Sequence, residues 1–195
     1  MATDRRIHRQ EGLPALIVLT GFRATGKTAV GRHLAQMCDY QFLDTDEELV
    51  ARMQCTIAEC VQQHGWGAFR EQERALLAEL ALWKKTVIAT GGGAILHQEE
   101  WQLLRQQARV VWFRTDLKPR LARLKGDKKT AGARPRLGAA EENQDLATET
   151  AALLAEREPL YRAGSDMVMD TEERTAKILA EDIYADFTYA LSAIV

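Results

Sequence analysis

Residues 15–31 read ALIVLTGFRATGKTAVG and join an apolar run to a glycine-rich loop. The run ALIVLT (15–20) is typical of a buried strand, and the residues from Lys27 onward have a helical pattern. Between these two elements, the spacing G-x-x-x-x-G-K-T extends from Gly21 to Thr28. Placed between a strand and a helix, this spacing predicts a loop that binds phosphate groups.

Phosphate binding explains the residue types in this loop. The backbone N–H groups of residues 23–28 can surround an anion, and the positive end of the following helix faces the same point. Gly21 and Gly26 allow backbone angles and close approaches that a Cβ atom would block. Lys27 would carry its charge to the β- and γ-phosphates of a nucleotide, and the Thr28 hydroxyl would bind Mg²⁺. The alternative is a glycine-rich turn without a ligand.

Strands and helices alternate along the whole chain. Short apolar runs predict five strands, at 15–20, 40–44, 86–90, 109–115 and 166–170. These runs are continuous rather than alternating, so we expect a sheet that is covered on both faces. Helical patterns are found at 27–38, 69–83, 143–161 and 175–194. The alternation predicts an α/β fold with a five-stranded parallel sheet flanked by helices.

The length and composition indicate a single domain, residues 1–195, that binds neither nucleic acid nor a membrane. The net charge of −2 implies no general attraction to nucleic acid or anionic lipid. No apolar run approaches the roughly 18 residues of a membrane span, and the polar N-terminus does not resemble a secretory signal. The three cysteines have no metal-type spacing and are expected to be reduced thiols of a cytoplasmic protein: Cys38, Cys55 and Cys60.

One segment, residues 124–143, has nothing to contribute to a core. It is rich in glycine, lysine and arginine, and Pro135 lies near its centre. A loop of this length inside a compact domain is usually functional or disordered.

The stretch FLDTD (42–46) ends in two acids that have two interpretations. Asp44 ends a predicted strand, Asp46 lies in the first turn of the next helix, and Thr45 with Glu48 fits a capping box. The acids either complement a helix N-terminus or face the ligand crevice at the strand ends. In the crevice, one carboxylate would hold Mg²⁺-bound water, and the other would accept a hydrogen bond from a substrate hydroxyl and orient it.

Two further stretches also have two interpretations each. In FREQE (69–73), Arg70 forms either a surface pair with Glu73 or a fork for a carboxylate. The three glycines 91–93 form either a permissive loop or a place where a group must approach the backbone closely. The four histidines show no metal-ligand spacing, and we expect no functional role for them: His8, His33, His64 and His97.

Taken together, these stretches resemble the shikimate kinase family over roughly residues 14–182. The resemblance rests on an ordered set of six motifs: GFRATGKT, FLDTD, FREQE, ATGGGAI, GARPRL and EREPLYR. It implies a P-loop fold of the nucleoside-monophosphate-kinase type with a mobile lid, here residues 124–140. The implied reaction is transfer of the ATP γ-phosphate to the 3-hydroxyl of shikimate, in the route to chorismate and the aromatic amino acids.

The resemblance also implies roles for individual residues. ATP would contact the loop, the lid and a neighbouring helix: Ala24, Thr25, Gly26, Lys27, Thr28, Ala29, Arg123 and Arg134. The segment 171–174 would lie beside adenine. Shikimate would be held by Asp46, Arg70, Gly91, Gly92, Gly93 and Arg157. The catalytic residues would be Asp46, Lys27 and Arg134, and Mg²⁺ would lie near Thr28 and Asp44.

Some features depart from the family pattern or lie outside it. The lid carries an extra arginine, Arg136, and is lengthened by TAGA. Residues 1–12 are expected to be a flexible tail, and 183–195 a packed helix extension rather than a partner-binding helix. We expect a monomer. The rival functions are another small-molecule kinase of this fold, such as a gluconate kinase, and a nucleotide-sensing module without turnover.

Overall fold

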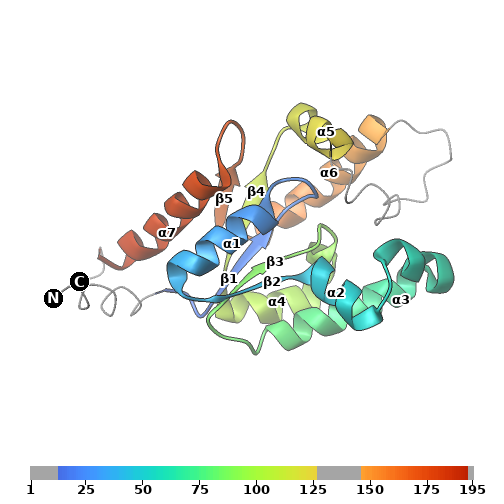
Figure 1. The fold of residues 1–195 in the computed structure, drawn as a ribbon, viewed down its shortest axis with the longest axis horizontal. Helices are drawn as coiled ribbons and strands as arrows, with labels where there is room; N and C mark the ends of the chain where they lie inside the picture. The colour runs from blue at the N-terminus through green and yellow to red at the C-terminus, as the bar shows by residue number, and fades with distance from the viewer. Residues whose placement is uncertain (1–12, 127–145, 193–195) are drawn as a thin grey trace.

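The computed structural model describes residues 13–126 and 146–192 (Figure 1). Five parallel strands form one sheet in the order β2-β3-β1-β4-β5. Their bounds are β1 Leu16–Thr20, β2 Gln41–Asp44, β3 Thr86–Ala89, β4 Ala108–Arg114 and β5 Met167–Asp170. Each predicted strand is present to within one or two residues, and the expected five-stranded parallel sheet is confirmed.

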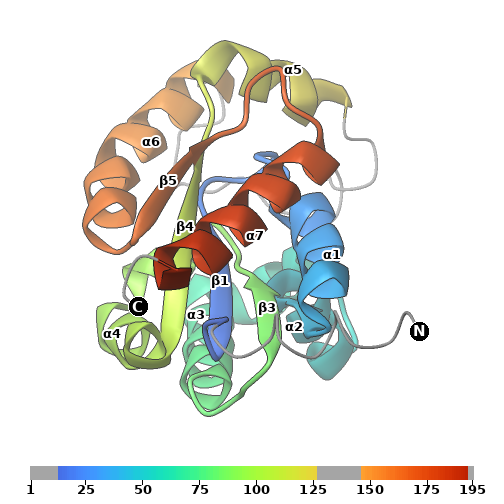
Figure 2. The same ribbon diagram turned by 90° about the vertical axis from the view of Figure 1, so that its left-hand side faces the viewer.

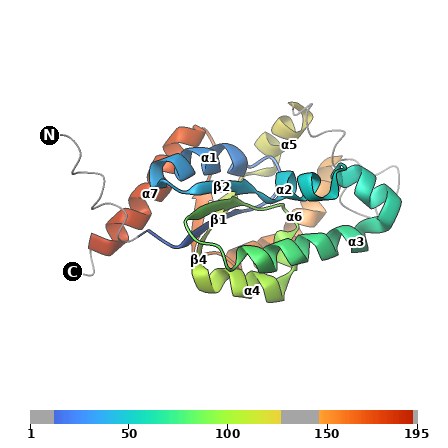
Figure 3. The same ribbon diagram turned by 60° about the horizontal axis from the view of Figure 1, so that its bottom comes forward.

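Helices cover both faces of this sheet, as Figure 3 shows. Helix α1 (Lys27–Cys38) lies beside α7 (Ala176–Ser192) on one face, which is the face seen in Figure 2. Helices α3 (Ile57–Leu80) and α4 (Gln98–Gln107) lie on the other. The central strand β1 packs against helices on both faces of the sheet, because its alternate side chains belong to two separate hydrophobic clusters. These are Leu16 and Val18 on the α3 side, and Ile17 and Leu19 on the α1 side. A continuous apolar run was therefore the right signal for a strand buried on both faces.

Four further elements lie at the end of the molecule where the carboxyl ends of the strands meet. They are α2 (Thr45–Met53), the 3₁₀ turn η2 (Ala94–Leu96), α5 (Leu117–Gly126) and α6 (Leu146–Ala163). The predicted tail 1–12 and most of the predicted lid 124–140 lie outside the described residues. None of the described helices combines the length and apolarity that crossing a membrane requires. All three cysteines are free thiols.

Helix α3 starts earlier than predicted and is broken inside. Thr56 is its N-cap and forms a capping box with Glu59, so the helix starts at Ile57 rather than near Phe69. Gly65 interrupts it with φ 80° and ψ 168°, a backbone conformation that is essentially restricted to glycine. The half of α3 that follows the break carries Phe69, Arg70 and Glu73, which line the cavity described below.

We predict that Gly65→Ala lowers the free energy of unfolding by about 1–3 kcal/mol, because alanine is strained at this φ and ψ. A Cβ atom at Gly65 would meet no neighbour within 4 Å, so the loss would come from the backbone alone. Gly67 offers a matched control, since its Cβ position is equally open but the residue is helical. Gly67→Ala should be neutral or stabilise by up to about 1 kcal/mol. Equal effects of the two substitutions in urea unfolding would contradict this explanation of the break.

Candidate active site

The predicted phosphate loop connects β1 to α1. Its last residue, Gly26, is the N-cap of α1 and has φ 93°, so the first turn of the helix opens onto the loop. Lys27 is 8% exposed, and its ammonium group donates hydrogen bonds to the carbonyl oxygens of Gly21 (2.9 Å) and Phe22 (2.7 Å). A helix N-terminus and a buried ammonium group on the same loop concentrate positive charge where a phosphate would bind.

A cavity beside this loop suits the rest of a nucleotide. It is lined by loop residues Ala24, Thr25 and Gly26, and by Thr171 and Arg174 from the segment after β5. The segment 171–174 thus lies next to the phosphate loop, where the resemblance expects adenine. Of the other residues expected at ATP, Arg123 belongs to α5, but its side chain is not described, and Arg134 lies outside the described residues.

Thr28 and Asp44, the pair expected at Mg²⁺, are in direct contact. The Thr28 hydroxyl donates to Asp44 Oδ2 at 2.6 Å. Asp44 Oδ1 accepts from the backbone N–H of Asp46 at 3.0 Å, so Asp44 also caps α2. A hydroxyl and a carboxylate are hard oxygen donors, and Mg²⁺ commonly uses one or two such groups together with nucleotide phosphates. These two residues therefore fit a magnesium ion shared with the nucleotide.

The predicted capping box of Thr45 and Glu48 is wrong. Asp44 is the N-cap, and Thr45 is already the first helical residue. The Thr45 hydroxyl instead accepts a hydrogen bond from the backbone N–H of Gly91 at 2.8 Å. The reason is that Asp44 leaves the strand in an extended conformation that lets its own carboxylate reach the free N–H groups of α2.

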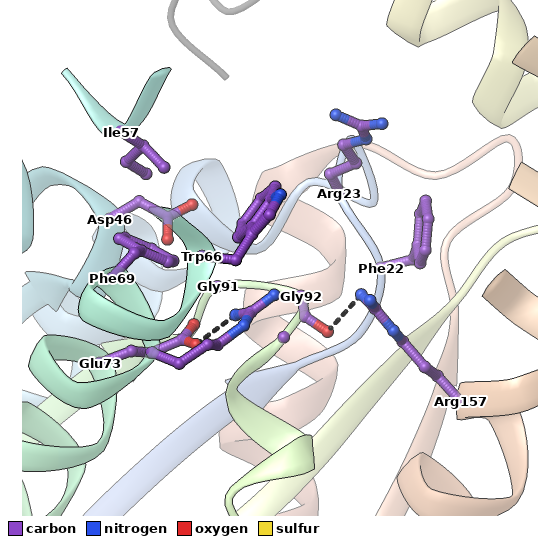
Figure 4. Close-up of a pocket in the computed structure, with 12 residues that line it drawn as sticks. Phe22, Arg23, Asp46, Ile57, Trp66, Phe69, Glu73, Gly91, Gly92 and Arg157 are labelled. Atoms are coloured by element: carbon purple, nitrogen blue, oxygen red, sulfur yellow. Dashed lines mark hydrogen bonds and ion pairs between the residues drawn. The ribbon is translucent and has the colours of Figure 1, made fainter. Parts of the chain in front are cut away.

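A second cavity opens next to the phosphate loop and collects most of the remaining predicted residues (Figure 4). Asp46 faces it from α2, Arg70 from α3 and Arg157 from α6, and the three glycines 91–93 line its floor. Phe22 and Arg23 of the phosphate loop form part of the wall. A molecule in this cavity would therefore lie directly beside the phosphates of a bound nucleotide.

The triple glycine fits the interpretation that groups approach this backbone closely, at two of its three positions. A Cβ at Gly91 would lie 2.5 Å from Asp46 Oδ1, and a Cβ at Gly93 would clash with the Arg70 guanidinium. The groups that approach this backbone closely are thus side chains of the site itself. At Gly92, by contrast, a Cβ would make only ordinary contacts.

Arg70 forms its ion pair with Glu73, but the pair is not on the surface. The Glu73 side chain is only 2% exposed, and its Oε2 accepts from Arg70 and also lies 2.9 Å from His97 Nε2. Burial works against the charged form of Glu73, but the hydrogen bond from His97 and the nearby Arg70 outweigh it and lower the pKa of this carboxyl. Glu73 is therefore a fixed negative charge behind Arg70.

Arg157 is held on the opposite side of the cavity. It is 3% exposed, its Nη1 donates to the Gly92 carbonyl oxygen at 3.4 Å, and its guanidinium carbon lies 5.9 Å from the centre of the Phe22 ring. Its Nε has no hydrogen-bond partner among the described residues. The Tyr161 hydroxyl donates to the same carbonyl at 2.5 Å, and burial raises the pKa of Tyr161 to about 12, so this donor stays protonated at neutral pH.

Sequence reasoning missed several residues around this cavity. Trp66, Phe69 and Ile57 form its apolar wall, Phe22 separates it from a neighbouring cleft, and His97 supports Glu73 from behind. The capping box at the start of α3 was a signal for the position of Ile57 and Trp66. The burial of Glu73 and its contact with His97, 24 residues away, had no local signal.

The cavity combines groups that recognise a small anionic polyol. Arg70 and Arg157 offer planar cationic forks for a carboxylate, and Asp46 offers a hydrogen-bond acceptor for hydroxyls. The phosphate loop at the cavity wall offers a phosphoryl donor site. This arrangement suits phosphoryl transfer to a hydroxyl of a carboxylated acceptor.

Comparison with known proteins agrees with this chemistry. A family model described as shikimate kinase matches residues 23–188. A shikimate kinase of Chromohalobacter salexigens is 36% identical over 173 residues, which span 89% of this chain and 91% of that protein. A solved gluconokinase from Sinorhizobium meliloti, 15% identical over 93% of this chain and 97% of its own, has a TM-score of 0.53 and shares only the fold. The solved shikimate kinase from Acinetobacter baumannii in complex with shikimate matches with a TM-score of 0.81 and 35% identity, covering 93% of this chain and 94% of that one. This chain belongs to the shikimate kinase family.

Proposed function

We propose that this protein transfers the γ-phosphate of ATP to the 3-hydroxyl of shikimate, giving shikimate 3-phosphate and ADP for the synthesis of chorismate and the aromatic amino acids. The observation that carries the proposal is the single cavity beside the phosphate loop, with Asp46 on one side and Arg70 and Arg157 around the rest. Shikimate is a small ring that carries one carboxylate and three hydroxyls, which matches two cationic forks and one acceptor.

On the donor side, Lys27 and the backbone of residues 24–29 hold the phosphates. Lys27 exchanges its carbonyl partners in the loop for phosphate oxygens when a nucleotide binds. Thr28 would bind Mg²⁺ and Asp44 would support it through water, and the ion would neutralise charge on the phosphates. The role of Arg134 as a lid residue that contacts ATP stays a prediction from the sequence.

On the acceptor side, Asp46 accepts a hydrogen bond from the hydroxyl that attacks and takes its proton as the new P–O bond forms. Its Oδ1 lies over Gly91, where the absence of a side chain leaves room for the carboxylate. Arg70 and Arg157 hold the carboxylate of the ring. The apolar wall of Trp66 and Phe69 excludes water from the reacting phosphoryl group, which would otherwise be lost to hydrolysis.

The protein is proposed to act as a monomeric, cytoplasmic enzyme in which residues 1–195 form one domain. Its activity is tested by measuring ADP release with Mg-ATP and a panel of shikimate, gluconate and nucleoside monophosphates. Release with shikimate alone, lost when EDTA removes magnesium, is expected. ADP release with gluconate alone supports the rival kinase, and the absence of ADP release with every acceptor of the panel supports a nucleotide-binding module without turnover.

Asp46→Asn should lower kcat roughly 10²- to 10⁴-fold, because the amide cannot accept the proton of the attacking hydroxyl. The KM for ATP should stay within about twofold, since Asp46 lies on the acceptor side. The neighbouring Glu47→Gln is the matched control: Glu47 is exposed and pairs with Arg32 on the surface. Steady-state kinetics of both variants check this, and equal kcat values would refute the role of Asp46.

Arg157→Ala should raise the KM for shikimate roughly 10- to 150-fold, the range expected for one charge-assisted hydrogen bond of about 1.5–3 kcal/mol. Nucleotide binding, measured by calorimetry with ADP, should barely change. Arg162→Ala on the same helix serves as the control, because Arg162 is exposed and pairs with Glu158. Equal weakening of shikimate and ADP binding in Arg157→Ala would show that this residue does not act on the substrate carboxylate.

A further inference from the structure

His97 lies behind the candidate active site and does not line its cavity. It follows the 3₁₀ turn η2 directly and precedes α4, so the triple-glycine turn and His97 belong to one short connection. Its backbone is held at both ends: its N–H donates to the Ala94 carbonyl at 3.2 Å, and its carbonyl accepts from the N–H of the fully buried Trp101 at 2.8 Å. The direction of the imidazole ring is therefore determined by well-anchored backbone.

The imidazole reaches from this connection to α3. His97 Nε2 lies 2.9 Å from Glu73 Oε2, and the imidazole side chain is 11% exposed. The same oxygen accepts from Arg70 Nη1. Two donors thus converge on one carboxylate oxygen: Arg70, three residues before Glu73 on the same helix, and His97, 24 residues after it.

The orientation of the Glu73 carboxylate is restricted by its surroundings. Its side chain is 2% exposed, and its other oxygen, Oε1, lies 3.2 Å from where a Cβ of Gly91 would be. The glycine leaves just enough room for the carboxylate beside the turn. A buried carboxylate held by two donors is oriented more strictly than one held by Arg70 alone.

The orientation of Glu73 matters because Arg70 has two tasks. Its guanidinium must pair with Glu73 and still present N–H groups to the cavity, where it lies against the rings of Trp66 (5.1 Å) and Phe69 (5.5 Å). If the hydrogen bond from His97 were lost, the Glu73 carboxylate could turn and present both of its oxygens to Arg70. A bidentate pair would then draw the guanidinium toward Glu73 and away from a bound carboxylate.

We propose that His97 is a positioning residue for substrate recognition: by holding Glu73, it keeps Arg70 directed at the carboxylate of the acceptor. The proposal rests on the proposed function, because it assigns the Arg70 fork to the carboxylate of shikimate. It gives a role to a histidine for which the sequence suggested none. His97 acts through Glu73 and Arg70 and touches neither the acceptor nor the nucleotide.

His97→Phe tests this, because it keeps a ring of similar size and removes the donor. The KM for shikimate should rise roughly tenfold, the effect expected from one charge-assisted hydrogen bond, while kcat and the KM for ATP stay within about twofold. His97→Gln, which restores an N–H donor, should recover most of the affinity. His64→Phe is the matched control, since His64 is exposed on α3.

Two further measurements separate positioning from a general loss of structure. The methyl ester of shikimate has no carboxylate charge, so its affinity should be the same in wild type and His97→Phe. In a Glu73→Gln background, His97→Phe should add little to the loss already present. An unchanged KM for shikimate in His97→Phe, or an equal loss for shikimate and its ester, would overturn the proposal. If His97→Phe does not fold, His97→Leu against His97→Gln carries the same expectations.

These outcomes are distinct from failure of the proposed function. Wild-type protein that does not phosphorylate shikimate argues against the function itself. Wild-type protein that does so, with a His97→Phe variant of unchanged KM, argues only against the role of His97.

Discussion

The site depends on glycine at positions 91 and 93, just after strand β3, because neither residue has a side chain. Because no Cβ atom occupies these positions, the side chains of Asp46 (α2) and Arg70 (α3) can both pack closely against the turn. The two helices thereby place the Asp46 carboxylate and the Arg70 guanidinium in one small cavity. Three consecutive glycines lose more conformational entropy on folding than other residues would, which lowers stability. In this site, that loss accompanies the close approach of the two side chains.

The charged groups of the proposed site are divided between the phosphate loop and the neighbouring cavity. The positive groups of the phosphate loop lie on one side, and the two arginines lie in the acceptor cavity. Glu73 balances Arg70 in a buried environment, where an unpaired charge of either sign would be costly. Phe22 and Arg23 belong to the loop and also line the cavity, so one segment of backbone lies between the two proposed binding sites.

Local signals predicted the strands and the phosphate loop, because an apolar run and a glycine-lysine spacing each act within a few residues. The same reasoning placed Asp46, Arg70 and Arg157 near one another only through the resemblance to a family. It missed local signals at two helices: Asp44 rather than Thr45 caps α2, and α3 starts at Ile57, after the Thr56 capping box, and breaks at Gly65. It had no access to contacts between residues far apart in the sequence. The burial of Glu73 depends on His97 and the turn, which no local pattern in FREQE reveals.

The central claim is that a carboxylated ring alcohol binds in the cavity beside the phosphate loop in one orientation. Its most direct test is a crystal structure of the protein with shikimate and ADP. The account predicts the ring carboxylate against Arg70 and Arg157, and the 3-hydroxyl within hydrogen-bond distance of Asp46. Shikimate bound in the opposite orientation, or in the separate cleft lined by Arg114 and Glu158, would contradict it.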